Sequence, residues 1–423
     1  MKTTMQLLCL LIALLCSIAV FGQELSPPEQ LGKSVFMDEN LSLNGNQSCA
    51  SCHDPEVGWT GPIEDINRFG GVYEGSVPGK FGNRKPPSVA YATQSPVFAF
   101  HRQAGGLFVG GNFWDGRATG EKLGNPAADQ AQGPFLNPLE QALGDNACVV
   151  YFVCNASYPV SLDEVYPGSC EVDWPADVEA QCGLADGLVD LDDMNAARVD
   201  MAYDSIALAI AAYEASPEVN AFSSKYDAYL AKLVDLSDTE KEGLKLFNGK
   251  AKCSRCHMSK AKQGQPPLFT DYTFDNLGAP RNVYNPFYDT AGFEWVDKGL
   301  GDFLRSRFEY VPMAEEHDGA QKVPTLRNVD LRPYPGFVKA FGHNGYFKSL
   351  KGIVHFYNTR DVKPVCEDPF TSEADAMTLG CWPKPEVSDN VNDGELGDLK
   401  LTDEQEDAIV AFLKTLSDGY VID

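Results

Sequence analysis

Two short stretches decide the fold, Cys49-Ala-Ser-Cys-His53 and Cys253-Ser-Arg-Cys-His257. Cys-x-x-Cys-His is the attachment sequence of c-type haem, because two thiols at this spacing add to the porphyrin's vinyl groups while the adjacent imidazole binds iron. A redox dithiol or half a zinc site would leave the histidine after each pair unexplained. The sequence therefore predicts two covalent haems. Their attachment and iron-binding residues are Cys49, Cys52 and His53 for the first, and Cys253, Cys256 and His257 for the second.

The segments around the two motifs repeat one another. Ser26-Pro-Pro-Glu29 precedes the first motif and Ser237-Asp-Thr-Glu240 precedes the second. Each has the Ser-x-x-Glu form of a capping box, in which side chains satisfy the free amides of a helix's first turn. Residues 204–214 and 404–416 are amphipathic, which predicts a closing helix for each copy. The same helical unit therefore occurs twice.

This repeat predicts the architecture. We expect a mainly α fold of two cytochrome c-like helical domains with long loops, each domain enclosing one covalent haem. Residues 61–90 and 266–324 are rich in Gly, Pro and Asn and form the predicted loops. A boundary near Ser216-Pro217 assigns residues 23–216 to an N-terminal domain and residues 217–423 to a C-terminal domain.

The N-terminus has the layout of a secretory signal peptide. Lys2 is followed by an apolar run over residues 7–20 and by the small residue Gly22. We therefore predict a cleaved signal peptide over residues 1–22, a periplasmic or otherwise exported protein, and no membrane span in the mature chain. A buried N-terminal helix is the alternative, although nothing later in the chain requires such a partner.

The cysteine count adds a prediction about disulfides. Of the twelve cysteines, two lie in the predicted signal peptide and four in the haem motifs. An even remainder in an oxidising compartment predicts three disulfides, which allow fifteen pairings, and we expect local pairs that include Cys366 with Cys381. The remaining six are Cys148, Cys154, Cys170, Cys182, Cys366 and Cys381.

The formal net charge is −26, from 60 acidic and 34 basic side chains. Nucleic acid and anionic lipid are therefore poor partners, and a basic or neutral electron-carrying protein suits better. The alternative is that the acidity serves solubility alone.

The group on the far side of each iron decides between electron transfer and catalysis. Residues 349–358 predict a helix on which Tyr357 shares one face with three apolar side chains, while His355 points the opposite way. If this face packs on a haem, Tyr357 is the side chain offered to iron, and His355 is a surface residue. The alternative is a tyrosine that only fills the core. Methionines and four histidines are the other candidate ligands. These histidines are His101, His317, His343 and His355.

Several further motifs resemble those of the bacterial di-haem cytochrome c peroxidases and their relatives of the MauG type. In family order they are Phe113-Trp-Asp-Gly-Arg117, Gly133-Pro134 with Glu140 six residues on, Leu326-Arg-Asn-Val329, and His343-Asn-Gly345. With the two Cys-x-x-Cys-His units, the resemblance spans nearly the whole mature chain.

The resemblance implies a role for each matched residue. It makes the N-terminal haem the peroxide site, with Gln130, Pro134 and Glu140 on its distal side, and the C-terminal haem the electron-transfer site. A carboxylate above iron can move a proton between the two peroxide oxygens, and an amide can hold the peroxide or a water. Trp114 matches the tryptophan between the two haems, which relays electron holes.

Tyr357 matches the distal ligand of the second haem. Reductively activated peroxidases of the family carry methionine there, while MauG-type members carry tyrosine. A phenolate favours oxidised iron, so it lowers the haem potential and makes a doubly oxidised, bis-ferryl state more accessible. The resemblance is therefore closer to the MauG type.

The chain also departs from the family pattern. Residues 54–84 contain no histidine, whereas reductively activated peroxidases have one there that caps the first iron. The first haem is therefore predicted to be open without prior reduction.

Lys85 replaces an asparagine that in relatives helps to hold a calcium ion between the domains. Backbone carbonyls remain available, so the resemblance still implies calcium. Ala251 replaces the surface tryptophan that MauG uses toward its partner, and residues 145–192 are extra.

We therefore expect a di-haem peroxidase. One predicted reaction is oxidation of a residue on a partner protein, which Tyr357 and the missing histidine favour. The other is detoxification of hydrogen peroxide with a small c-type cytochrome or copper protein as electron donor, which is the commoner activity in the family. A non-catalytic electron-transfer cytochrome is the alternative outside the enzyme class.

Overall fold

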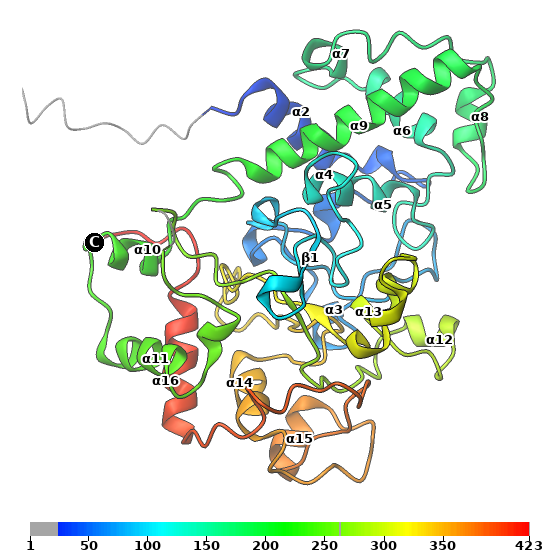
Figure 1. The fold of residues 1–423 in the computed structure, drawn as a ribbon. Coiled ribbons are helices and arrows are strands. Elements are labelled where there is room, and N and C mark those ends of the chain that lie inside the picture. The colour runs from blue at the N-terminus through cyan, green and yellow to red at the C-terminus, as the bar shows by residue number, and fades with distance from the viewer. Residues whose placement is uncertain (1–23, 262–263, 423) are drawn as a thin grey trace, which may run out of the picture.

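A computed structural model describes residues 24–261 and 264–422, and its regular structure is mainly helical (Figure 1). The predicted signal peptide, residues 1–22, lies outside the described residues. The helices before residue 220 are α2 (Pro27–Met37), α3 (Glu64–Arg68), α4 (Pro126–Ala131), α5 (Gly133–Leu136), α6 (Asn146–Asn155), α7 (Leu162–Val165), α8 (Val178–Cys182) and α9 (Asp193–Ala215). Those after it are α10 (Lys225–Leu230), α11 (Asp238–Asn248), α12 (Phe287–Ala291), α13 (Leu300–Arg305), α14 (Leu350–Thr359), α15 (Glu373–Leu379) and α16 (Asp403–Lys414).

Sheet structure in the described residues is confined to two antiparallel pairs. Strand β1 (Ala99–His101) pairs with β2 (Leu107–Val109), and β3 (Phe274–Asp275) pairs with β4 (Gln321–Lys322). The predicted mainly α class is therefore confirmed. In those same residues no helix is both long and apolar enough to cross a membrane.

The predicted repeat is present as the same helix crossing made twice. Helix α2 packs on α9 through Gly32, where a Cβ atom would lie 1.9 Å from the carbonyl oxygen of Ala209. Helix α11 packs on α16 through Gly243, where a Cβ atom would lie 1.9 Å from the carbonyl oxygen of Ala408. Both opening helices begin with the predicted capping box. Each crossing thus needs glycine, because any side chain would force the helices apart.

Helix α9 is longer than the amphipathic stretch predicted for it. It begins at Asp193, where the Asp192 side chain accepts a hydrogen bond from the backbone of Asn195. The first half of the helix is rich in Asp, Asn and Arg, so its apolar pattern is weak, but Val199 and Ala202 are buried. Packing against the extra segment of the chain explains this extension.

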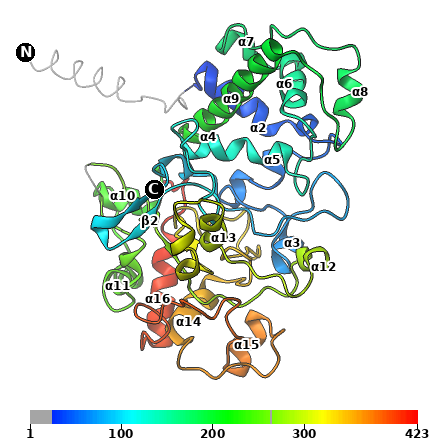
Figure 2. The ribbon, with the colours of Figure 1, turned by 45° about the vertical axis from the view of Figure 1, so that its right-hand side comes forward.

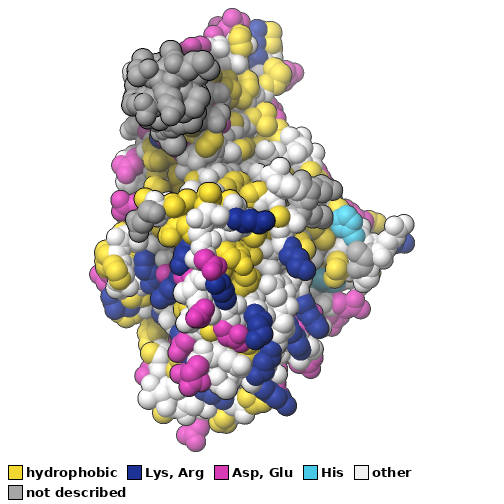
Figure 3. All heavy atoms as spheres, turned by 90° about the vertical axis from the view of Figure 1, so that its left-hand side faces the viewer, with side chains coloured by type: hydrophobic (Ala, Val, Ile, Leu, Met, Phe, Trp, Pro, Cys, Tyr) yellow, Lys and Arg dark blue, Asp and Glu magenta, His cyan; other side chains and the backbone are white. Residues whose placement is uncertain are grey.

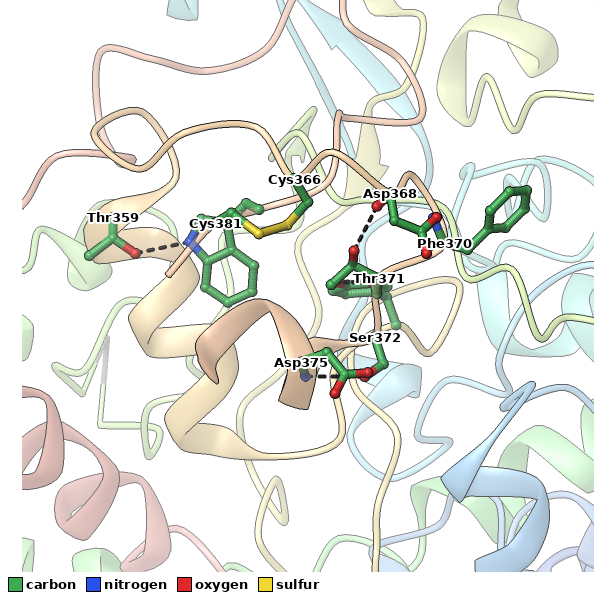
Figure 4. The surroundings of a disulfide bond; sticks show 10 residues. Thr359, Cys366, Asp368, Phe370, Thr371, Ser372, Asp375 and Cys381 are labelled. Carbon is green, nitrogen blue, oxygen red and sulfur yellow. Dashed lines mark hydrogen bonds between the residues drawn. A yellow bond between two sulfur atoms is a disulfide. The ribbon is translucent and has the colours of Figure 1, made fainter. Parts of the chain in front are cut away.

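The extra segment contains α6, α7 and α8 and is closed by two disulfides. Cys148 pairs with Cys182, and the pair of Cys154 with Cys170 lies inside that loop. The predicted third pair, Cys366 with Cys381, is also present (Figure 4). Beside it, Trp382 Nε1 donates a hydrogen bond to Thr359 Oγ1 over 3.0 Å, which ties the segment around α15 to the end of α14.

Two large hydrophobic cores lie at opposite ends of the molecule. In Figures 1 and 2, α2, α6 and α9 surround one end, and α11, α14 and α16 surround the other. The buried residues of the first core run from Leu31 to Val219 and those of the second from Tyr226 to Leu416. A smaller cluster, which includes Phe108 and Leu300, joins the two halves of the chain. The domain boundary at Ser216-Pro217 stays a prediction.

Candidate active site

One continuous cavity of about 450 Å³ connects the two halves of the chain. Its walls contain both Cys-x-x-Cys-His motifs and every other predicted site residue. Those other residues are Trp114, Gln130, Pro134, Glu140 and Tyr357. Residues far apart in the sequence therefore meet around a single space.

The two motifs have the same local structure. Cys49–Ser51 and Cys253–Arg255 each form one 3₁₀ turn, and the four motif cysteines are not disulfide-bonded. Nδ1 of His53 lies 3.2 Å from the carbonyl oxygen of Trp59, and Nδ1 of His257 lies 2.8 Å from that of Phe269. Because a carbonyl only accepts, Nδ1 carries the proton in each ring, and Nε2 is left to bind iron.

Burial keeps both imidazoles neutral, the form that binds a metal. Desolvation lowers the pKa of His53 to about 4, although the carbonyl of Trp59 opposes this shift. Desolvation also lowers the pKa of His257, against the carbonyl of Phe269. A neutral ring with its Nδ1 proton held by a carbonyl is the usual state of a haem-binding histidine.

The cavity lining fits a haem in chemistry as well as in its anchors. Phe36 and Ile210 line it near the first motif, and Phe347 and Val354 line it near the second. Five lining side chains also have buried polar atoms that find no hydrogen-bond partner among the described residues. They are Gln47, Gln141, Tyr272, Gln321 and Glu386. A haem is an apolar macrocycle with polar edge groups, so it would pack on the apolar walls and offer hydrogen-bond partners to these polar atoms. Buried polar atoms are costly to leave without a partner.

The predicted distal residues of the first haem come from two short helices and the turn after them. Gln130 lies on α4 and Pro134 on α5, and Glu140 follows α5. The backbone of Glu140 is fixed by hydrogen bonds with Asn137 and Ser76. Burial raises the pKa of the Glu140 carboxyl, while the positive charge of Arg117 opposes that shift. A carboxyl so placed can exchange a proton more readily near neutral pH.

Trp114 lies at the junction of the two halves and is bonded to both. Its indole Nε1 donates to the carbonyl oxygen of Lys85 over 2.8 Å, and its own carbonyl accepts from the backbone of Lys322 over 2.7 Å. The imidazole of His343 lies edge-on to the indole, with 6.4 Å between ring centroids. Trp114 is 8% exposed, so its ring is held in one position.

A buried charge network beside Trp114 was missed by the sequence reasoning. Arg84 donates two hydrogen bonds of 2.7 Å to Asp297 and one of 2.6 Å to Asp115. Asp115 also accepts from Arg117. Asp115 and Arg117 stand within a recognised motif, but no pattern marks Asp297, which comes from the other half of the chain.

Tyr357 projects from α14 into the cavity, as its predicted helix face requires. Leu350, Ile353 and Val354 of the same face also line the cavity. The backbone of Gly397 donates to the carbonyl oxygen of Tyr357 over 2.6 Å. Burial is the main cause that raises the pKa of the phenol. A nearby ferric iron would favour the phenolate instead.

The prediction that His355 is a surface residue is wrong. Its side chain is 20% exposed, and its Nδ1 lies 2.8 Å from Oε1 of Glu406 on α16. The opposite face of α14 packs on a second helix instead of facing water, and Asn358 donates to the same carboxylate. His355 thus fixes α14 from behind and does not approach the cavity lining.

The other candidate histidine ligands are also placed. His101 is exposed, and Nδ1 of His317 lies 2.8 Å from the carbonyl oxygen of Met313. His343 lines the cavity, with its Nε2 3.9 Å from Asp297. His343 therefore stands beside Trp114 and the charge network.

The residues present do not fit the calcium ion that the resemblance implies. Lys85, at the position of the expected asparagine, places its ammonium 2.6 Å from Thr60 Oγ1 and 2.8 Å from the carbonyl oxygen of Pro86. Among the described residues, the one cluster of three side chains able to bind a metal contains Cys256, a haem-attachment residue, with Asp275 and Glu395. Calcium prefers several oxygen ligands without a competing cation.

Comparisons with known proteins identify the family. A family model for di-haem cytochrome c peroxidase matches residues 27–235. The methylamine utilization protein MauG of Paracoccus denitrificans is 34% identical over 424 residues, covering 98% of this chain and 96% of MauG. Cytochrome c551 peroxidase of Nitrosomonas europaea is 27% identical over 326 residues, covering 77% of this chain and 71% of that protein. The solved diheme peroxidase BthA of Burkholderia thailandensis matches with a TM-score of 0.69 and 28% identity, covering 94% of this chain and 87% of BthA.

Proposed function

Because this chain belongs to the di-haem cytochrome c peroxidase family, as a relative of its MauG type, we propose that it reacts with hydrogen peroxide at the haem on Cys49, Cys52 and His53. Family membership makes the chain an oxidoreductase with two haems. The peroxide site, the electron route and the partner are the parts that we propose.

The distal residues carry the peroxide step. A haem held by Cys49, Cys52 and His53 would supply an iron able to bind and activate peroxide. Glu140 would take a proton from one peroxide oxygen and return it to the other, so that the departing oxygen could leave as water. Gln130 orients the peroxide, and Pro134 limits the space around it. The burial of Glu140 and its place in the cavity wall support this role.

The electron route leads through Trp114 to the second haem, on Cys253, Cys256 and His257. The contacts of the indole with Lys85 and Lys322 hold it between the halves. Tyr357 is proposed as the distal ligand of the second iron, where an anionic oxygen stabilises the oxidised state. Its place in the cavity wall supports that assignment.

We propose a partner protein residue, such as a tryptophan, as the substrate. Tyr357 and the absence of histidine from residues 54–84 favour this reaction. Ala251 is 4% exposed, so the partner contact of MauG is not carried over, and the disulfide-closed segment offers a different docking surface. Peroxide removal with a small c-type cytochrome or copper protein as donor is the second candidate. In either case, we propose that the protein is exported. We also propose that the boundary between its two domains lies near Ser216.

The shared cavity is the observation that carries this proposal, since it brings Glu140, Trp114 and Tyr357 together between the two haem motifs. The test is to mix the ferric holoprotein with one equivalent of peroxide and follow the haem spectrum. We expect a rapid change that decays slowly without an electron donor.

Two variants separate the parts of the proposal. Glu140→Gln should slow the spectral change by about 10²- to 10⁴-fold, the usual contribution of a positioned proton-transfer group. Tyr357→Met should leave that first change intact and shorten the life of the product. Two six-coordinate haems that do not respond to peroxide would instead identify a plain electron-transfer cytochrome.

A further inference from the structure

Three lysines lie at the junction of the two halves, namely Lys85, Lys322 and Lys339. Lys85 is 7% exposed and Lys339 is 4% exposed, whereas Lys322 is half-buried, and all three line the cavity. Among the described residues, the hydrogen-bond partners of these ammonium groups are neutral oxygens and include no carboxylate. A buried cation without a counter-ion is costly, so these positions call for a physical explanation.

Neutral oxygen atoms surround each ammonium group. Lys339 donates to the carbonyl oxygens of Val57 and Leu331 over 2.8 Å each, and to that of Asn328 over 3.2 Å. Carbonyl oxygens from both halves of the chain thus converge on the ammonium group of Lys339. The same kinds of oxygen serve as ligands for calcium in proteins.

The other two lysines lie on either side of Trp114. Lys322 Nζ donates to Asn112 Oδ1 over 2.8 Å, to Ser95 Oγ over 3.0 Å, and to the carbonyl oxygen of Gly111. Its backbone amide bonds the carbonyl of Trp114, while the carbonyl of Lys85 accepts the indole proton. Two amino groups that can carry positive charge therefore flank the tryptophan, and burial lowers the pKa of each to about 7.

Of the three lysines, Lys85 is the one whose contacts most directly oppose the binding of a metal ion. Its ammonium already occupies the oxygen atoms of Thr60 and Pro86, and its backbone amide donates to the carbonyl of His343 in the other half over 2.7 Å. A divalent cation a few ångströms from that ammonium would be repelled strongly in a low-dielectric interior. The side chain that would supply the calcium ligand in relatives here supplies a cation.

We propose that the amino group of Lys85 occupies the position of the calcium ion that the family resemblance implies, so that no metal joins the two halves. Hydrogen bonds from Lys322 and Lys339 across the junction hold the halves together instead. These contacts are made by the chain itself, so chelators and calcium supply do not affect them. This inference does not depend on peroxide reactivity.

The first test uses the holoprotein after exhaustive dialysis against EGTA. Calcium per chain, Tm and the haem spectrum are measured with and without about 1 mM CaCl2, a concentration at which extracellular calcium modules bind. We expect no stoichiometric calcium, and the same Tm and spectrum in both conditions. One retained calcium per chain, or a Tm that rises with added calcium, would overturn the proposal.

A second test uses Lys85→Asn, which exchanges the cation for a side-chain oxygen. We expect this variant to bind calcium and to gain a calcium-dependent rise in Tm, because a ligand that binds the folded state stabilises it. Lys80→Asn, the same exchange at an exposed lysine, is the matched control and should gain neither. A calcium-free wild type whose Lys85→Asn variant also ignores calcium would show that the ammonium does not occupy a calcium position.

Discussion

At the scale of single residues, Tyr357 should set the potential of the second haem. An anionic phenolate stabilises oxidised iron, whereas a thioether stabilises reduced iron. We therefore expect Tyr357→Met to raise the midpoint potential of that haem by on the order of 100 mV, within the wide range that axial ligands span. Spectroelectrochemical titration measures this shift. Tyr346→Phe is the control, because Tyr346 is buried in the same core but bonds Thr371. Equal midpoint potentials in wild type and Tyr357→Met would show that Tyr357 does not bind the iron.

Glu214 should make stability depend on pH. It is 2% exposed and lines the cavity, and burial raises the pKa of its carboxyl to about 8 from an ordinary value of 4.5. The folded protein thus keeps a proton that the unfolded chain releases. Its stabilising contribution is complete below the ordinary pKa and is lost as pH rises toward the raised one.

Glu214→Gln, which cannot ionise, should therefore raise Tm relative to wild type by about 3–5 °C more at about pH 8 than at about pH 5. Differential scanning calorimetry of the two holoproteins checks this. A Tm difference that is the same at both pH values would show that Glu214 titrates normally in the folded state.

Neighbouring residues show what the sequence could and could not predict at this scale. The cysteines and histidines of the motifs follow from spacing, and Tyr357 follows from a helix face together with resemblance. His355 was misplaced because helical periodicity tells which residues share a face but does not tell what covers the other face. Asp297 and Glu214 carry no local pattern, and their importance comes from partners and burial that exist only in the fold.

At the scale of helices, the two glycine crossings should be sensitive to a single methyl group. Gly32→Ala places a Cβ atom against the Ala209 carbonyl, which is backbone and cannot rotate away. We expect a loss of about 1–3 kcal/mol in the free energy of unfolding, the usual cost of overpacking. Thermal or denaturant unfolding of the holoprotein measures it.

Gly243→Ala should have a similar effect at the matching crossing, where the Ala408 carbonyl stands in the way. Gly336→Ala is the control, because a Cβ atom there meets nothing within 4 Å. If the three variants were equally stable, the close helix contact would not be needed.

The predicted helices that have a strong local signal are present. Capping boxes placed the starts of α2 and α11, and amphipathic patterns placed α14 and α16. The disulfide-closed segment was predicted as an insertion but without its helices. Helices α7 and α8 have four and five residues, too few for a period to be recognised, and are held by tertiary packing and disulfides.

At the scale of the whole molecule, surface charge is distributed unevenly. Between Lys225 and Lys260 the chain has eight Lys and Arg residues and five Asp and Glu residues, in contrast to its net charge of −26. Figure 3 shows Lys and Arg side chains gathered on the face that carries α10, α11 and α16. The second haem motif belongs to this segment. The net charge of the whole chain predicts a basic or neutral partner. Net charge is a sum over the whole surface, however, and does not show that one face is basic.

We therefore expect an acidic redox protein to associate at this face faster at low salt than at high salt. Combining Lys245→Glu with Lys250→Glu should lower the association rate constant by about 10-fold at low ionic strength. Both lysines are exposed, as is Lys80, whose change to Glu is the control for a general charge effect. Stopped-flow kinetics against ionic strength measures this, and equal rates for all variants would place the contact elsewhere.

The shared cavity is the property of the whole molecule that matters most, and the sequence could not establish it. Spacing predicts two haem sites, but the meeting of both motifs with Glu140, Trp114 and Tyr357 around one space depends on how the two halves pack. That packing rests on contacts between residues more than a hundred positions apart, such as Arg84 with Asp297. Such pairs leave no trace in local sequence patterns.

Whether the first haem is open to peroxide without prior reduction is tested by comparing two oxidation states of the protein. The fully oxidised holoprotein and the protein reduced by one electron are each mixed with one equivalent of peroxide in a stopped-flow spectrophotometer. We predict that the fully oxidised protein reacts at once, because residues 54–84 offer no histidine to cap the iron. A fully oxidised protein that stays inert until it receives one electron would show that its first haem is closed to peroxide before reduction.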